Sequence, residues 1–427
     1  MKIKQLLVAA AVFGFTAAQA QTKEPKVLFI GLDGTRSDAL QQANTPTLDS
    51  LMNTGINTFD AWHMGVTVSG PSWSNMLTGV NEAKHKVTNN SYTGADYANW
   101  PYLVNRIKEE RAIKAVQIIT WNSMDDASKG TGGHVYNAKW DLSIDVGNQG
   151  QDLIRDASII QLQDPNLDFL FAYIQDADGA GHGTGFSLTS PAYINAIENN
   201  DAQVKAILKA LKARPTYAQE EWLIVCSTDH GGLGFGHGGN SDQERHIWWF
   251  ASAPFLQNKT LTGPDIGSYQ MPSNPVDSTL LGQVPKQTDV AVTIIDHLLP
   301  GLDGDDVKSR WNLDGRSWLT PDNYDSTLYE NQKGGIKGVS LNEKHADAAF
   351  GVYPNPVQSQ IQLQSNGAFN GKISYELIDL NGRLSAAGEL DLSPQAVIEV
   401  AHLENGFYLL RIRQGEALIN RKIVIRH

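Results

Sequence analysis

Carboxylate and imidazole side chains recur in this sequence where short apolar runs end. Glycines flank these positions and allow the backbone to approach a bound ion closely. Carboxylate oxygens and imidazole nitrogens are ligands for divalent metal ions. The candidates are Asp33, Asp178, His182, Asp229, His230 and His237. Six ligands exceed the four that one tetrahedral zinc ion takes, and they suit two ions about 4 Å apart acting on a phosphoryl group.

A serine at an expected turn offers a nucleophile for such a reaction. Ser69 is followed by Gly-Pro and opens the segment Ser69–Gly79, which predicts a tight turn before a short helix. Its oxygen would face the ions while the helix N-terminus favours the resulting anion. The commoner role of an isolated serine at this place is to cap the helix, so both interpretations stay open.

Apolar runs of strand length must position these side chains. The expected strands are Lys26–Leu32, Ala115–Thr120, Asp168–Ile174, Trp222–Cys226 and Ile247–Ala253. Continuous apolar runs are typical of strands buried on both faces of a parallel sheet. Apolar residues at helical spacing between Ile194 and Leu211 predict a helix, and Thr47–Asn53 predicts a shorter one. The pattern indicates an α/β fold with a mostly parallel sheet and helices on both faces, which places ligands at the carboxyl ends of its strands.

The sequence changes character near Tyr324. We expect a catalytic domain over residues 21–323, followed by a polar, glycine-containing linker over 324–349. From 350 to 427 apolar and polar residues alternate, as at Ile373, Tyr375 and Leu377. Asn-Gly turns, including Leu380-Asn381-Gly382, separate these runs, which predicts a small antiparallel β-sandwich.

Composition and the N-terminus limit the possible functions. The 427 residues carry a formal net charge of −12, which argues against binding to a nucleic-acid duplex. Residues 1–20 have two lysines, an apolar stretch and Ala18-Gln19-Ala20, which predicts a secretory signal peptide. That stretch is too short to span a membrane, and no other run qualifies, so no transmembrane segment is expected. The single cysteine, Cys226, excludes an internal disulfide and is expected in the core.

The motifs around the candidates resemble those of the alkaline phosphatase superfamily, nearest to type I phosphodiesterases and nucleotide pyrophosphatases. They are GLDGTRSD (Gly31–Asp38), SGPSWSNMLTG (Ser69–Gly79), DGAGH (Asp178–His182) and TDHGG (Thr228–Gly232). The resemblance implies one ion held by Asp33, Ser69, Asp229 and His230. It implies a second ion held by Asp178, His182 and His237. It also implies that Ser69 is the nucleophile and that the Asn90 amide binds a phosphoryl oxygen.

Several neighbouring residues compete for these roles. Thr67 is an alternative to Ser69 as the nucleophile, and His246 is an alternative to His237 as a ligand. His85 is expected to be a packed structural residue. His134 and His297 are expected to be non-catalytic, the latter on a helix.

The resemblance implies a hydrolase that uses two divalent ions, and the signal peptide implies that it is secreted. The mixed imidazole and carboxylate ligands favour zinc, with manganese and calcium as alternatives. The small phosphorylated substrate of the hydrolase would be a diester or pyrophosphate, cleaved through a phosphoseryl-type intermediate. A phosphomonoesterase is the main alternative, in which Lys129 or Lys139 would bind the additional charge. A sulfatase is less expected, because this chain has Trp73 where sulfatases carry an arginine. A protein that keeps the ions for structure only is the alternative from another class.

The C-terminal segment resembles the sorting domain of the type IX secretion system. The matching residues are YPNP (Tyr353–Pro356), DLNGR (Asp379–Arg383), LENGFYLLRI (Leu403–Ile412) and a closing strand, Arg421–Ile425. The resemblance implies that the type IX machinery is a partner. It further implies export through the periplasm and across the outer membrane, to a secreted or cell-surface location.

Overall fold

The structure is a computed structural model that describes residues 23–131, 136, 138–147, 150–264, 266, 279–324, 350–365, 371–379, 383–393, 395–414 and 417–427. The chain divides into two compact units, Met1–Gln332 and Lys333–His427. The expected signal peptide, His134, the Leu380-Asn381-Gly382 turn and all of the expected linker except Tyr324 lie outside the described residues. Tyr324 is buried and forms an isolated bridge with Leu256.

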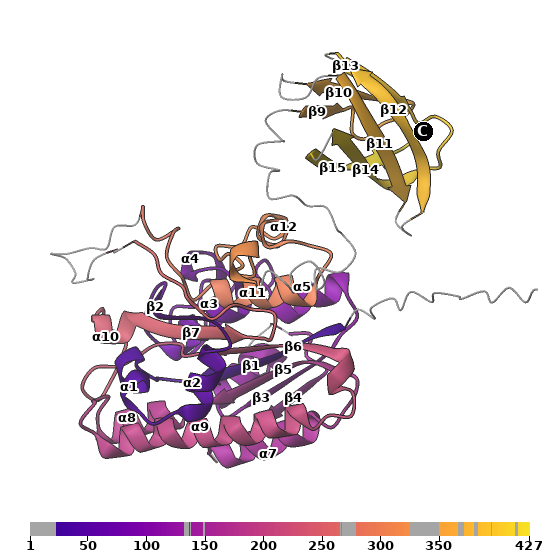
Figure 1. Cartoon of the computed structure of the whole chain (residues 1–427). Helices are drawn as coiled ribbons and strands as arrows, with labels where there is room; N and C mark the ends of the chain where they lie inside the picture. The colour runs from indigo at the N-terminus through magenta and orange to yellow at the C-terminus, as the bar shows by residue number, and fades with distance from the viewer. Residues whose placement is uncertain are drawn as a thin grey trace, which may run out of the picture. The chain divides into compact units, whose positions relative to one another are not determined.

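A large sheet forms the middle layer of the first unit (Figure 1). Its described strands are β1 (Glu24–Leu32), β2 (Gly55–Trp62), β3 (Lys114–Ile119), β4 (Leu142–Asp145), β5 (Leu167–Ile174), β6 (Glu220–Ser227), β7 (His246–Ser252) and β8 (Lys259–Thr260). Their spatial order is β4-β3-β5-β1-β6-β7-β2-β8. Strands β4, β3, β5, β1 and β6 are parallel neighbours. The mostly parallel sheet expected from the apolar runs is therefore confirmed.

Strand β7 departs from the parallel pattern, because it pairs antiparallel with both β6 and β2. The segment between β6 and β7 contains only the one-turn helix α10 (Asp242–Arg245). Parallel neighbours are usually joined by a helix that crosses over the sheet, whereas antiparallel neighbours need none, and this connection has no helix longer than α10. The apolar run alone does not reveal this direction. Strand β2 was also not expected from the sequence.

Helices cover both faces of the sheet, as expected from the alternation of strands and helices (Figure 1). They are α1 (Ser37–Gln42), α2 (Pro46–Met52), α3 (Ser69–Thr78), α4 (Glu82–His85), α5 (Leu103–Glu110), α6 (Asn122–Lys129), α7 (Gln151–Gln161), α8 (Asp176–Thr184), α9 (Pro191–Lys212), α11 (Asp289–Leu298) and α12 (Gly304–Arg310). Phe29 of β1 lies in a core with α3, α5 and α11, whereas its neighbours Leu28 and Ile30 lie in a core with α1, α2, α7 and α9. Successive strand residues point to opposite faces, so one strand serves both cores.

The second unit consists of two antiparallel sheets. Its strands are β9 (Phe350–Tyr353), β10 (Gln360–Ser365), β11 (Gly371–Asp379), β12 (Leu384–Leu392), β13 (Gln395–Glu399), β14 (Gly406–Gln414) and β15 (Ala417–Ile425). The sheet orders are β13-β10-β9 and β12-β11-β14-β15. Ile361 of the first sheet and Leu377 and Leu410 of the second belong to one buried core. The expected antiparallel β-structure of this segment is confirmed.

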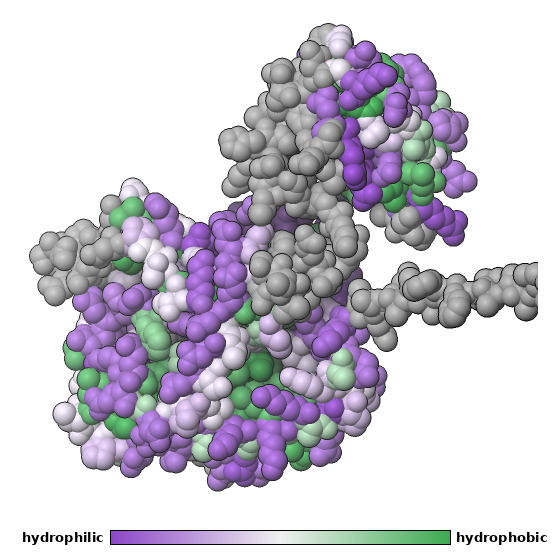
Figure 2. Space-filling model, viewed as in Figure 1, coloured by the Kyte–Doolittle hydropathy of each residue, from purple (hydrophilic) through white to green (hydrophobic). Residues whose placement is uncertain are grey.

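Hydrophilic residues predominate on the face of the molecule in Figure 2, interrupted by small apolar patches. This is the surface expected when strands and helices turn their apolar faces inward. Within the described part of the chain, no helix is both long and apolar enough to cross a membrane.

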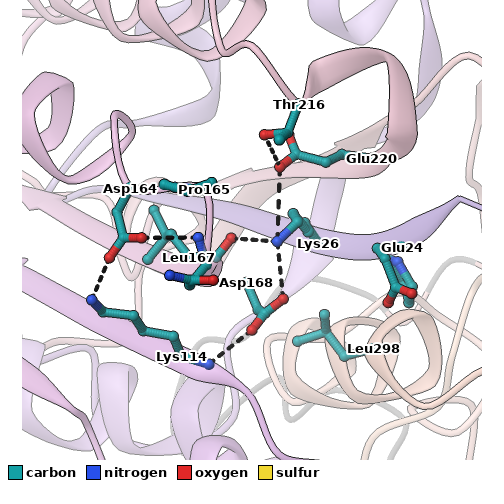
Figure 3. Close-up of polar contacts among 12 residues, drawn as sticks. Glu24, Lys26, Lys114, Asp164, Pro165, Leu167, Asp168, Thr216, Glu220 and Leu298 are labelled. Atoms are coloured by element: carbon teal, nitrogen blue, oxygen red, sulfur yellow. Dashed lines mark hydrogen bonds and ion pairs between the residues drawn. The ribbon is translucent and has the colours of Figure 1, made fainter.

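Charged side chains at the amino ends of the central strands are paired with opposite charges (Figure 3). The Lys26 ammonium at the start of β1 donates to Asp168 Oδ1 at 3.0 Å and lies 3.8 Å from Glu220 Oε1. Glu220 Oε1 in turn lies 2.7 Å from an Arg214 nitrogen, and Lys114 pairs with Asp164. Each of these carboxylates therefore has a cationic partner, which satisfies charges removed from water.

Candidate active site

The candidate residues converge at the carboxyl ends of β1, β5 and β6. Asp33 follows β1, and its amide donates to Ile174 O at the end of β5. Asp178 and His182 are one turn apart in α8, which begins just after β5. Gly34 makes the turn after β1 possible, because its φ is +64° and a Cβ there would lie 2.7 Å from Asp178 Cβ.

The inner group consists of Asp33, Ser69, Asp229 and His230. His230 Nε2 is its centre: it lies 3.2 Å from Ser69 Oγ, 3.3 Å from Asp229 Oδ2 and 3.7 Å from Asp33 Oδ1. All four side chains are buried. The structure thus places one hydroxyl, two carboxylates and one imidazole around a common point.

The outer group consists of Asp178, His182 and His237. Asp178 Oδ1 lies 3.5 Å from His182 Nε2 and 3.6 Å from His237 Nε2. The His237 ring stacks on that of His230, with centroids 3.8 Å apart, which brings the two groups side by side. Two triplets have ligand atoms within 4.8 Å of one another: Asp178, His182 and His237; and Asp33, Asp178 and His230.

All three imidazoles are oriented in the same way. Nδ1 of His182 lies 2.9 Å from Phe235 O, that of His230 lies 2.8 Å from Gly231 O, and that of His237 lies 2.8 Å from Thr67 O. A carbonyl oxygen only accepts, so each Nδ1 donates its hydrogen. In the neutral ring Nε2 then carries a lone pair, and all three Nε2 atoms face the carboxylates. This orientation is typical of histidines that bind a metal ion.

Within the described residues, no lysine or arginine pairs with the carboxylates of the cluster, unlike those at the other end of the strands. Asp33 Oδ1, Asp178 Oδ1 and Asp229 Oδ2 are buried and have no hydrogen-bond partner within the described residues. Burial raises the pKa of Asp178 to about 8 and raises the pKa of Asp33 and Asp229 above the ordinary value. Burial also lowers the pKa of His230 and His237. Unpaired oxygens and neutral imidazoles fit divalent ions, which supply the missing positive charge.

The hydroxyl groups of Ser69 and Thr67 have different surroundings. Val68 is the N-cap of α3 and Ser69 is its first residue, so Ser69 does not cap the helix. Thr67 Oγ1 donates to Gly239 O at 2.9 Å and accepts from Gly238 N at 3.0 Å. Thr67 therefore holds the loop that carries His237, while the Ser69 hydroxyl faces His230.

Asn90 lies beside the start of α3. The Gly70 amide donates to Asn90 Oδ1 at 2.7 Å, so the remaining arm of this side-chain amide, Nδ2, is a donor. A Cβ at Gly70 would lie 2.7 Å from Asn89 O and 3.0 Å from Asn90 Oδ1. Glycine at position 70 is therefore what permits this close approach. Asn90 itself is exposed.

The other histidines considered as candidates lie outside the cluster. His246 Nδ1 is 3.7 Å from Asp60 Oδ1, and its Nε2 is 3.9 Å from Asp242 Oδ1. His85 is buried and its Nε2 lies 2.8 Å from Asn75 Oδ1. His297 lies in α11, as expected.

Of the two lysines considered for binding additional charge, Lys129 is paired with the carboxylate of Asp125 at 2.6 Å. Lys139 is exposed, and its backbone amide donates to Asn105 Oδ1.

Several residues that donate hydrogen bonds to the candidate metal ligands were not predicted from the sequence. Trp73 Nε1 and the Tyr173 hydroxyl both donate to Asp33 Oδ2, at 3.1 and 2.6 Å. Gln287 Nε2 donates to Asp229 O at 2.6 Å. Trp73 stands four residues after Ser69, which is a usable signal for a shared helix face. Gln287 has no such signal, because it is far from Asp229 in the chain.

Two segments of the chain match known families. Residues 27–235 match the family described as type I phosphodiesterase / nucleotide pyrophosphatase. The matched segment is thus similar to that family, and the fold is alkaline phosphatase-like. Residues 351–426 match the secretion system C-terminal sorting domain, which indicates export. Both resemblances expected from the motifs are confirmed.

Similar solved structures have low sequence identity to this chain. A 2-O GAG sulfatase and a putative sulfatase from Bacteroides thetaiotaomicron VPI-5482 each have a TM-score of 0.50 and 14% identity, covering 88% of this chain and 85% of theirs. Murine ectonucleotide pyrophosphatase / phosphodiesterase 5 has a TM-score of 0.49 and 14% identity, covering 65% of this chain and 95% of that one. A search of curated proteins found no match to this chain.

Proposed function

We propose that this protein is an exported hydrolase that uses two divalent ions, preferentially zinc, to cleave small phosphate diesters or pyrophosphates. One observation carries the proposal: three imidazoles and three carboxylate oxygens that lack hydrogen-bond partners within the described residues form one cluster, and the Ser69 hydroxyl lies 3.2 Å from its His230 Nε2. The family match over residues 27–235 supports the phosphoric ester chemistry.

The ligands divide between two ion positions. The inner group, Asp33, Ser69, Asp229 and His230, would hold one ion, and the outer group, Asp178, His182 and His237, would hold the other. Bound divalent ions would lower the pKa of the serine hydroxyl and of water and would neutralise charge on the phosphoryl oxygens. Mixed imidazole and carboxylate ligands favour zinc.

Ser69 acts as the nucleophile. Its oxygen attacks phosphorus, the ester oxygen leaves with a proton, and a phosphoseryl-type intermediate remains on Ser69. Water then attacks the phosphorus, and the bond to Ser69 Oγ breaks. The position of Ser69 as the first residue of α3 favours its anionic form, because the helix N-terminus carries partial positive charge.

Asn90 stabilises the transition state. With Oδ1 held by the Gly70 amide, Nδ2 is available to donate to a non-bridging phosphoryl oxygen. The ions require deprotonated ligands, and burial raises the pKa of the three carboxyl groups. Activity is therefore expected to favour neutral to alkaline pH.

Two related activities fit the residues less well. A phosphomonoesterase would need a further cation near the site, yet Lys129 is neutralised by Asp125. A sulfatase would need the arginine that Trp73 replaces. Trp73 is fully buried and donates to Asp33, so it binds no substrate. The sulfatase structures named above share the fold, and this similarity does not extend to the reaction.

The second unit supports the expected route of the protein. Its match to a sorting domain favours passage through the type IX machinery, following a signal peptide at residues 1–20 and export into the periplasm. We propose a secreted or cell-surface location. The domain limits proposed are 21–323 for the catalytic domain, 324–349 for the linker and 350–427 for the sorting domain.

The test compares three substrates on the wild-type protein and on Ser69→Ala. The substrates are bis-p-nitrophenyl phosphate, p-nitrophenyl phosphate and p-nitrophenyl sulfate, and bound metal is measured in each sample. We expect the diester to have the highest kcat/KM, and Ser69→Ala to keep its ions but lose turnover. A matched variant, Thr67→Val, should retain turnover at a reduced level. Turnover by Ser69→Ala equal to that of the wild type would reject Ser69 as the nucleophile.

A further inference from the structure

The carboxylate of Asp33 is held on one side only. Its Oδ2 accepts hydrogen bonds from the Tyr173 hydroxyl at 2.6 Å and from the Trp73 indole at 3.1 Å. Its Oδ1 has no hydrogen-bond partner within the described residues and lies 3.7 Å from His230 Nε2. One oxygen is thus fully engaged by the protein, and the other is left for a ligand.

The two donors come from rigid parts of the fold. Trp73 lies one turn after Ser69 in α3, and Tyr173 lies in β5, paired in register with Gly31 of β1. Both side chains are buried, and their rings meet edge to face with centroids 5.3 Å apart. A Cβ at Gly31 would collide with the Trp73 ring, so the indole is seated directly on the backbone of β1.

The inner and outer groups differ in their access to solvent. The side chains of Asp33, Asp229 and His230 are at most 1% exposed. In the outer group the side chain of His182 is 46% exposed. Hydrogen bonds that orient a ligand typically change metal affinity 10- to 100-fold. A buried position with an oriented carboxylate should therefore retain its ion better than a partly exposed one.

We propose that Trp73 and Tyr173 are positioning residues that fix Asp33 as a one-oxygen ligand and make the inner position the tighter of the two metal sites. The proposal rests on the proposed function only in requiring that ions bind at these two groups. In this proposal Trp73 orients a metal ligand. The arginine at the corresponding position of sulfatases would instead bind the substrate.

The experiment measures zinc binding to the metal-stripped full-length protein by chelator competition, which yields one dissociation constant for each ion. Tyr173→Phe and Trp73→Phe each remove one donor to Asp33 and keep an aromatic ring. We expect the tighter constant to weaken by about 10-fold or more in each variant, while the weaker constant stays within error.

Control variants separate this effect from lost packing. Trp249 is fully buried in the same core as Trp73, and its indole nitrogen has no hydrogen-bond partner within the described residues. Tyr102 is an equally buried tyrosine whose hydroxyl contacts Tyr97 at 3.5 Å. Trp249→Phe and Tyr102→Phe should leave both zinc constants unchanged. If Trp73→Phe fails to fold, Tyr173→Phe still provides the test, since it removes a single oxygen.

The outcomes distinguish this inference from the proposed function. The roles of Trp73 and Tyr173 would be overturned if both positioning variants had the zinc dissociation constants of the wild type, or if both constants weakened equally. Neither result would contradict the proposed hydrolase function. A wild-type protein that binds no zinc would overturn the proposed function together with this inference. Selective weakening of the tighter constant supports the inference even if the natural substrate differs from the one proposed.

Discussion

His182 and His237 face each other through their Nε2 atoms, which are 3.1 Å apart. Each ring donates from Nδ1 to a backbone carbonyl, so two lone pairs point at one another when both rings are neutral. Asp178 Oδ1 lies within 3.6 Å of both nitrogens. This arrangement is repulsive unless a cation or a proton lies between the three atoms. It explains why removal of metal should affect the stability of the fold as well as the activity.

The first prediction concerns metal removal at two pH values. Burial raises the pKa of Asp178 to about 8, and it also raises the pKa of Asp33 and Asp229. A carboxyl group with a higher pKa in the folded state binds its proton more tightly when folded, so stability falls as pH rises toward that pKa. Histidines in the unfolded chain have a pKa of about 6.5, so they are mostly neutral at higher pH. Between about pH 6.5 and pH 8 the carboxyl groups therefore determine how the stability of the metal-stripped protein changes with pH.

We expect the metal-stripped protein to unfold at a lower temperature at pH 8.5 than at pH 6.5, and zinc to raise the midpoint more at pH 8.5. Thermal unfolding followed by circular dichroism provides the measurement. The Asp178→Asn variant should show a smaller difference between the two pH values in the metal-stripped form. A midpoint that is the same at both pH values without metal would contradict the predicted protonation of the cluster.

The second prediction concerns Asn90. Loss of a donor that binds a developing oxyanion typically costs about 10² to 10³ in kcat. We expect Asn90→Ala to lose activity in this range with unchanged zinc content, because its side chain is outside the metal groups. Asn89→Ala is the matched control, since Asn89 is also exposed and its side chain accepts bonds from Ser91. Equal kinetics for the two alanine variants would remove Asn90 from the mechanism.

The third prediction concerns the charge network at the amino ends of the strands. Lys26 is 5% exposed and contacts Asp168 and Glu220. Its replacement by methionine removes the hydrogen bond to Asp168, while Glu220 keeps Arg214 and Asp168 keeps Arg111 at 3.8 Å, so the free energy of unfolding should fall by about 1.5 to 3 kcal/mol. Chemical denaturation measures the change, and exposed Lys205 provides a Lys→Met control. We expect kcat of folded Lys26→Met to be unchanged, and a large fall in kcat without loss of stability would contradict this separation.

Much of the fold follows from local pattern. The apolar runs predicted β1, β3, β5, β6 and β7 to within about two residues at each end. The direction of β7 and the existence of β2 did not follow, because a strand's direction depends on the connection that precedes it. Strand β2 contains several polar residues, so its sequence predicts a strand less clearly than the apolar runs of the buried parallel strands do.

The amino-acid sequence by itself determined which residue types could bind ions and that they follow successive strands. Ligand type and strand order are local properties that a chain carries in any conformation. Only the tertiary structure decided that the Ser69 hydroxyl, and not that of Thr67, faces His230, and that His246 lies apart from the cluster. It also decided that Trp73 donates to Asp33. These outcomes depend on hydrogen bonds between distant segments, whose geometry exists only after the sheet and helices have packed.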